Sequence, residues 1–202
     1  MSRFTLFFAL SMMVPACSTV ETPTADAAES QKAPDFSLTD LGGTTHRLAD
    51  QKGKIVVLEW YNPDCPFVVQ AHGEDGALRT LGDQWTSKGI VWWAINSGAS
   101  GKQGTGIERN QSSKAEYAFN YPVLLDEPGT VGRLYDAKTT PHMVIIDASG
   151  HVAYDGALSN APFGDAGGEP FVNHVDNALT SLLDGNAVKT RKTKPWGCGV
   201  KY

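Results

Sequence analysis

The sequence predicts one α/β domain in which a central mixed β-sheet is flanked by helices. Two β-branched apolar segments, 54–61 and 89–96, are typical of strands that are buried on both faces. Segments with helical apolar spacing alternate with them, which favours a mostly parallel sheet with helices on both sides. A pair of strand-like segments near the C-terminal end, 142–147 and 151–157, adds an antiparallel edge.

Length and charge narrow the class of protein. The 202 residues are enough for one domain with a substantial core. The formal net charge of −5 disfavours non-specific nucleic-acid binding, which needs a basic face. Because no apolar run reaches the ~18 residues that span a bilayer, no transmembrane helix is expected. We therefore expect neither a nucleic-acid partner nor a membrane-spanning segment.

The first 17 residues have the layout of an export signal. Arg3 precedes a short apolar stretch, and this stretch ends in Val-Pro-Ala-Cys at Cys17. That ending resembles the bacterial lipoprotein box, in which the cysteine becomes the lipid-modified first residue. We therefore expect an exported protein that Cys17 anchors to a membrane on its periplasmic side. An ordinary signal cleaved near Ala16 is the alternative.

The polar segment that follows, 18–33, reads as a flexible tether, so the folded domain is expected to span 34–202. Its first strands are a hairpin around Gly42-Gly43. The buried strand 54–61 leads into a helical pattern over 67–85, which Gly73 and Gly76 weaken in the middle.

The second half of the domain continues the alternation. After strand 89–96 comes a Gly/Ser-rich rim loop, and then a short helix that Ser112 or Ser113 caps and that runs to Phe119. The remaining predicted elements are a strand at 121–126, a short helix at 129–136, the strand pair named above and a helix at 169–185. The chain then has a polar, basic tail that ends in Trp-Gly-Cys-Gly-Val-Lys-Tyr.

Cys65 is the strongest candidate for chemistry. It follows the turn signal Asn-Pro-Asp at the junction of a strand and a helix, so we expect it to be partly exposed. A helix N-terminus stabilises the thiolate, the nucleophilic form of cysteine. The carboxylate of Asp64 would oppose this if it faced the sulfur. A packed, unreactive cysteine is the alternative.

Three segments together resemble the thioredoxin-like superfamily, in its redoxin and peroxiredoxin-like (AhpC/TSA-type) branch. They are "PDFSLTDLGG", "VVLEWYNPDCPFV" and "TTPHMVIID", and the resemblance covers about residues 34–202. It implies a thioredoxin-like fold with Cys65 in the place of the first cysteine of a Cys-x-x-Cys motif. Val68 stands where the second would be, so the usual local disulfide is impossible. The resemblance also implies a cis-proline at Pro141, with Thr140 offering its backbone to an extended substrate.

Cys198 is then the candidate partner of Cys65. If Cys17 is lipidated, Cys65 and Cys198 remain as an even pair in an exported protein. The glycines beside Cys198 allow a flexible tail to close over the site, and we expect an oxidised Cys65–Cys198 bridge whose reduction frees the tail. A free tail thiol is the alternative.

Two further residues are secondary candidates. Glu59, inside an apolar strand, has the place of the buried acid that assists proton transfer in thioredoxin, although a solvent-facing carboxylate is the alternative. His142 follows the expected cis-proline and could tune the thiolate or, with Cys65, bind a soft metal. His72 lies about two helical turns beyond Cys65, too far to be its base. For both histidines a solvated or packed role competes.

These features favour an exported thiol–disulfide oxidoreductase in which Cys65 is the nucleophile and Cys198 resolves the mixed state. It would act on protein or small-molecule thiols and disulfides with an external reductant, and would need neither cofactor nor metal. One alternative is a thiol peroxidase, disfavoured because Asn62 replaces the expected Thr and the segment before Pro141 offers Lys138 but no Arg. The other is a non-catalytic metal carrier that uses Cys65, Cys198 and a histidine.

Overall fold

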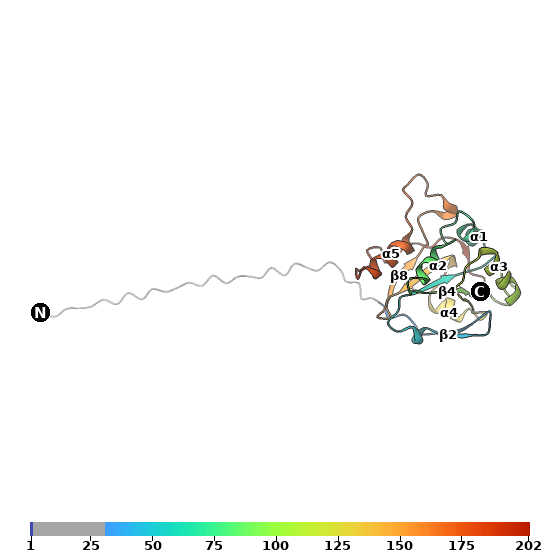
Figure 1. Ribbon diagram of the computed structural model, residues 1–202, viewed down its shortest axis with the longest axis horizontal. Helices are drawn as coiled ribbons and strands as arrows, with labels where there is room; N and C mark the ends of the chain where they lie inside the picture. Colours follow the sequence, from blue (N-terminus) through green and yellow to red (C-terminus); the bar gives the residue numbers. More distant parts are fainter. Residues whose placement is uncertain (2–30) are drawn as a thin grey trace.

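The central feature of the fold is one seven-stranded sheet with the strand order β2-β1-β5-β4-β3-β7-β8 (Figure 1). The computed structural model describes Met1 and residues 31–202. The export signal, Cys17 and most of the expected tether therefore lie outside the described residues. The strands of this sheet are β1 (Ser37–Asp40), β2 (Thr45–Arg47), β3 (Val56–Trp60), β4 (Val91–Asn96), β5 (Val123–Leu125), β7 (His142–Ile146) and β8 (Val152–Gly156).

The sheet is mixed, as predicted, but the expectation that it is mostly parallel is wrong. Only β3–β4 and β4–β5 are parallel pairs. The other pairs, β1–β2, β1–β5, β3–β7 and β7–β8, are antiparallel. The reason is that an antiparallel hairpin lies at each side of the short parallel centre. A separate two-stranded ribbon pairs β6 (Thr139–Thr140) with β9 (Cys198–Gly199).

Helices cover both faces of the sheet. They are α1 (Pro66–His72), α2 (Leu81–Thr86), α3 (Ile107–Tyr117), α4 (Thr130–Leu134) and α5 (His174–Leu183), with short 3-10 turns η1 (Leu48–Gln51) and η2 (Pro162–Gly164). Buried residues of α1, α2 and α5 share one core, and those of α4 and η1 share the other. Figure 1 shows α1 and α5 above β4, and α4 below it. None of the helices in the described ranges has the length and apolar character needed to cross a membrane.

Two predicted helices differ from the structure. The helical pattern 67–85 forms two helices, because the chain leaves the helix at Gly73 and approaches the end of α1 so closely at Gly76 that a Cβ there would lie 2.2 Å from the Ala71 carbonyl oxygen. The helix expected to begin at Ser112 or Ser113 begins at Ile107, and Ser113 lies inside it.

The edges of the domain also differ. The segment expected to form a helix from 169 becomes helical only at His174, where the side chain of Asn173 accepts from the Asp176 amide. Residues 31–33, assigned to the tether from sequence, pair with the β7–β8 turn: the Val152 amide donates to the Gln31 carbonyl at 2.8 Å. Main-chain hydrogen bonds to the hairpin thus extend the fold before residue 34.

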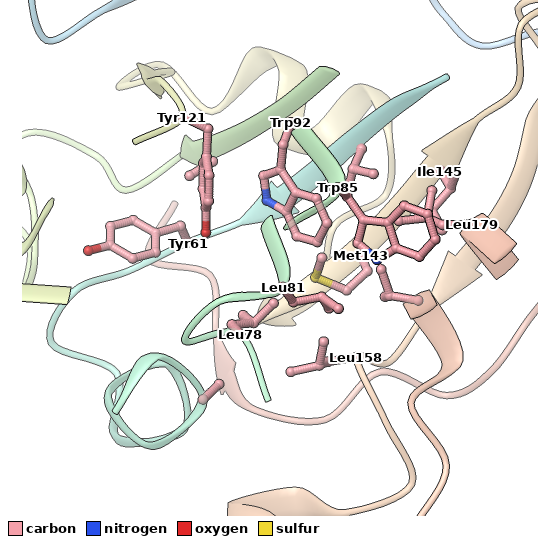
Figure 2. Packing of buried hydrophobic residues seen from close by; sticks show 14 of the residues in the cluster. Tyr61, Leu78, Leu81, Trp85, Trp92, Tyr121, Met143, Ile145, Leu158 and Leu179 are labelled. Carbon is pink, nitrogen blue, oxygen red and sulfur yellow. The ribbon is translucent and has the colours of Figure 1, made fainter. Parts of the chain in front are cut away.

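The core on the α1 side is rich in aromatic side chains (Figure 2). Tyr61, Trp92 and Tyr121 lie near Met143 and the leucines of α2 and its neighbouring loop. Side chains alternate along β3, so Val57 and Tyr61 enter this core while Leu58 and Trp60 enter the opposite one. Consequently Cys65, a member of the first core, and Trp60 lie on opposite sides of the sheet.

Candidate active site

Cys65 is positioned by a turn that the sequence Asn-Pro-Asp specifies. The side chain of Asn62 accepts from the Asp64 amide at 2.9 Å, and its carbonyl accepts from the Cys65 amide at 3.1 Å. Cys65 is then the N-cap of α1, and Pro66 takes the first helical position, where its missing N–H costs nothing. This is the strand-to-helix junction that the sequence predicted for Cys65.

The expectation that Cys65 is partly exposed is wrong, since its exposed fraction is 0%. Its side chain belongs to the core on the α1 side, and Trp196 and Cys198 pack against that core from the C-terminal tail. The turn signal correctly predicted the backbone conformation at Cys65. It carried no information about the C-terminal segment, more than 130 residues away, that covers the sulfur.

The Thr140–Pro141 peptide bond is cis, as the resemblance implied. The thiol of Cys65 donates to the Thr140 carbonyl, with the sulfur 3.0 Å from the oxygen. The Thr140 hydroxyl is also buried, and it has no hydrogen-bond partner among the described residues. An unpaired buried donor beside a thiol gains a partner when that thiol becomes a thiolate.

The C-terminal strap, residues 191–202, brings Cys198 to the same place. Strand β9 pairs antiparallel with β6, with Cys198 opposite Thr140. Before β9, the Trp196 indole donates to the Ser159 carbonyl at 2.7 Å. After β9, the Val200 amide donates to the Lys138 carbonyl at 3.2 Å.

The last residues complete the anchoring of the strap. The Ala99 amide donates to the Lys201 carbonyl at 2.8 Å, and the Tyr202 hydroxyl donates to the Ala137 carbonyl at 2.9 Å. Both Cys65 and Cys198 are free thiols in this docked arrangement. The expectation of a flexible tail that reduction releases is therefore wrong, because backbone and side-chain bonds hold the strap without a disulfide.

The two thiols differ in acidity. Burial alone would raise the pKa of Cys65, but the side chains of Cys198 and Thr140 and the Val68 and Cys198 amides lie where they can donate to the thiolate, and together they hold this pKa below its ordinary value. Burial, and then the neighbouring Cys65, raise the pKa of Cys198 to about 11. Between these two pKa values, Cys65 is the thiolate and Cys198 is the protonated thiol.

The Thr140 hydroxyl can be tested through this pKa. Thr140→Val removes the donor and keeps the side-chain shape, so the pKa of Cys65 should rise toward its ordinary value and the thiolate should appear at higher pH. Ultraviolet thiolate absorbance against pH measures this shift. Thr140→Ser, which retains the hydroxyl, is the matched control and should titrate like the native protein. An unchanged titration of the valine variant would remove Thr140 from the group that stabilises the thiolate.

The charge of the Asp64 carboxylate, which could have disfavoured a Cys65 thiolate, is paired with a guanidinium. Its carboxylate accepts from Arg109 Nε at 2.7 Å, and the same guanidinium donates to the Pro63 carbonyl. Burial would lower the pKa of Arg109, but its pairing with Asp64 raises it. Sequence reasoning missed Arg109, because nothing local shows that α3 reaches a turn 45 residues earlier.

Glu59 is buried, so the solvent-facing alternative is wrong. One carboxylate oxygen lies 2.7 Å from Nε2 of His72, which is equally buried, and the other accepts from Trp92 Nε1 at 3.0 Å and from the Tyr121 hydroxyl at 3.2 Å. Burial, together with Glu59, raises the pKa of Tyr121. These bonds connect Glu59 to the core and none of them reaches Cys65, so its role in proton transfer stays a prediction.

His142 does not face Cys65. It pairs with Trp60 across β7 and β3 and packs on that ring, on the opposite side of the sheet. Its Nε2 lies 2.7 Å from Asp155, and its Nδ1 accepts from the Lys138 amide. Both ring nitrogens are thus engaged, and the metal set of two cysteines and this histidine is not assembled. Across residues 31–202, no group of three or more His, Cys, Asp or Glu side chains is placed to hold a metal ion.

Comparisons with known proteins agree with this geometry. The model of the AhpC/TSA family matches residues 30–155. The thiol-disulfide oxidoreductase ResA of Geobacillus kaustophilus is 28% identical over 62% of this chain and 67% of its own. The thioredoxin-like protein YneN of Bacillus subtilis is 32% identical over 60% of this chain and 67% of its own.

Similarity to a solved structure extends over a larger share of the chain. An uncharacterized conserved protein from Geobacillus kaustophilus has a TM-score of 0.75 and 30% identity, over 86% of this chain and 91% of its own. The comparisons confirm the expected thioredoxin-like fold and support an oxidoreductase activity. Since the family match ends at residue 155, Cys198 lies outside it, and the strap must be interpreted from its own contacts.

Proposed function

Because the chain belongs to the AhpC/TSA family, we propose that it is a thiol–disulfide oxidoreductase whose redox pair is Cys65 and Cys198. The observation that carries the proposal is the pairing of β9 with β6. It places Cys198 opposite Thr140, whose carbonyl accepts a hydrogen bond from the Cys65 thiol. A second thiol beside a cysteine with a lowered pKa is the arrangement that an internal disulfide needs.

In the proposed cycle the pair alternates between two thiols and one disulfide. In the first step, Cys198 attacks one sulfur of the substrate disulfide and passes its proton to the neighbouring Cys65 thiolate, so one half of the substrate leaves as a thiolate and the other half stays bound to Cys198 as a mixed disulfide. Cys65 then loses this proton to solvent, and its thiolate attacks the Cys198 sulfur. The Cys65–Cys198 bond forms, the substrate leaves as a thiolate, and the protein has lost two electrons. External thiols return these electrons by the reverse exchange, one bond at a time.

The chain's own residues prepare Cys65 for this role. The Thr140 hydroxyl and the Val68 and Cys198 amides are positioned to stabilise the thiolate. The same groups make Cys65 a good leaving group when the disulfide is opened, because a thiol of lower pKa leaves faster. Glu59 is buried with His72, which is the last residue of the helix that Cys65 caps, and it is proposed as the acceptor of a proton from the site.

The test of the pair is mild oxidation followed by non-reducing peptide mapping of the monomer. We expect one intramolecular link between the peptides of Cys65 and Cys198, and catalysed reduction of a small disulfide by dithiothreitol. A peroxide-consumption assay in parallel addresses the peroxidase alternative. Only intermolecular Cys65–Cys65 links, or a Cys198 that is always free, would contradict the redox pair.

We also propose that the protein is exported and anchored by a lipid on Cys17, with thiol or disulfide substrates and a reductant on the periplasmic side. The support is the sequence, in which an apolar run of signal length stops at that cysteine. Cys17→Ser should leave the protein unprocessed or release it from the membrane fraction. Cell fractionation and intact-mass measurement of the N-terminus check this. A mature protein that begins at another residue and carries no acyl chain would refute it.

A further inference from the structure

Strand β9 fills the backbone edge beside Cys65. In the ribbon, Cys198 and Gly199 are the partners of Thr140 and Thr139, and the Val200 amide takes the Lys138 carbonyl. An extended polypeptide binds such an edge through the same main-chain groups. A substrate chain and β9 therefore compete for one set of hydrogen bonds. Because β9 is part of the same polypeptide, it does not have to bind from solution as a substrate chain does.

The fit of β9 depends on one glycine. Gly197 has a φ of +139°, and a Cβ at this position would lie 2.2 Å from the Thr140 carbonyl oxygen. That distance is far shorter than any real Cβ contact, and the neighbour is backbone that cannot move aside cheaply. On the other side of Cys198, a Cβ on Gly199 would meet nothing within 4 Å. The two glycines thus offer a disruptive and a neutral position one residue to either side of the same cysteine.

While the strap is docked, the two cysteines differ in their exposure to solvent. Cys65 is fully buried, whereas Cys198 is only partly buried. Next to Cys198 the ring of Phe67 contacts Phe163 and Trp196, with centroid distances of 4.0 and 5.8 Å. A reactant that approaches the docked site from solvent therefore meets the Cys198 sulfur and this aromatic rim, and it does not meet Cys65.

We propose that the docked protein takes low-molecular-weight thiols and disulfides, which exchange at the Cys198 sulfur, and that β9 excludes extended polypeptide disulfides from Cys65. This inference rests on the redox pair proposed above. In the exchange, a small thiolate attacks Cys198 of the internal disulfide. A mixed disulfide forms, and Cys65 leaves as a thiolate. A second small thiolate attacks the substrate sulfur of that mixed disulfide, which forms the external disulfide and releases the Cys198 thiolate, and this takes up a proton from solvent.

The experiment compares two substrates across matched variants of the full mature chain. Hydroxyethyl disulfide is the small substrate and insulin the polypeptide substrate, with dithiothreitol as reductant. The native protein should catalyse reduction of hydroxyethyl disulfide and leave insulin at its uncatalysed rate. Gly197→Ala displaces β9 and exposes Cys65, so the ratio of insulin to hydroxyethyl disulfide rates should rise at least about tenfold. Gly199→Ala should keep the native ratio.

A second variant avoids any change at the edge itself. The Tyr202 ring lies under the Arg133 guanidinium, 4.3 Å from its centroid, so Tyr202→Ala loosens the strap from its far end. It should raise the same ratio even if Gly197→Ala fails to fold, which circular dichroism reports. Efficient insulin reduction by the native protein, or an unchanged ratio in a folded loosened variant, would overturn the proposed substrate class. A native protein that catalyses neither reaction would instead overturn the redox pair.

Discussion

Cys65→Ser is expected to bring the rate of small-disulfide reduction down to the uncatalysed rate. The serine hydroxyl is not ionised near neutral pH and cannot form the internal bridge. Cys198 alone cannot replace the pair, because no neighbouring thiolate accepts its proton and no second cysteine resolves its mixed disulfide. The dithiothreitol-coupled assay with hydroxyethyl disulfide measures this rate.

Cys198→Ser is the matched control for this loss. It should retain the Cys65 thiolate, titrating at somewhat higher pH because one hydrogen-bonding neighbour is weakened, but it should form no internal bridge. Circular dichroism should show native folding for both variants, since each replaces sulfur by a smaller oxygen. If Cys65→Ser keeps more than a small fraction of the native rate, Cys65 is not the nucleophile that closes the internal bridge.

Glu59→Leu is expected to cause the largest loss of stability. The substitution leaves three buried donors, on His72, Trp92 and Tyr121, without their acceptor. Breaking a buried polar pair from one side costs about 3–5 kcal/mol in the free energy of unfolding. For a domain of this size that corresponds to a fall in Tm of roughly 10 °C. Urea and thermal unfolding followed by circular dichroism give both values.

Glu59→Gln is the conservative comparison, because its amide oxygen can still accept from one or two of these donors. It should lose clearly less stability than the leucine variant. The double variant Glu59→Leu, His72→Leu should recover part of the loss, since one of the unpaired partners is removed as well. A cost below about 1 kcal/mol for Glu59→Leu would mean that the hydrogen bonds of Glu59 contribute little to the folded state.

The sequence predicted the parts of the site that are local. The turn before Cys65 and the helix that begins after it follow from a few adjacent residues, and the family resemblance implied the cis bond at Pro141. The strands β3 and β4 were predicted for the same reason, since a continuous β-branched apolar run is typical of a strand buried on both faces.

What the sequence could not give depends on distant contacts. The burial of Cys65 requires the strap, Arg109 reaches Asp64 from α3, and His142 turns away because β7 pairs with β3 in one particular register. A shift of one residue in that register would reverse the face of every side chain on β7. The glycines near the C-terminus suggested flexibility, yet Gly197 is there because backbone passes close to backbone.

That close passage has a consequence for how related sequences can diverge. Only glycine fits at position 197 while β9 is docked, whereas position 199 has room for a side chain. In descendants that keep the docked cysteine, selection should therefore fix glycine immediately before it and leave the residue after it free to vary. A lineage that loses this glycine should lose the tail cysteine as well, because the two residues serve one geometry. In related sequences, the Gly-Cys pair, and not the cysteine alone, should therefore identify proteins whose site is covered in this way.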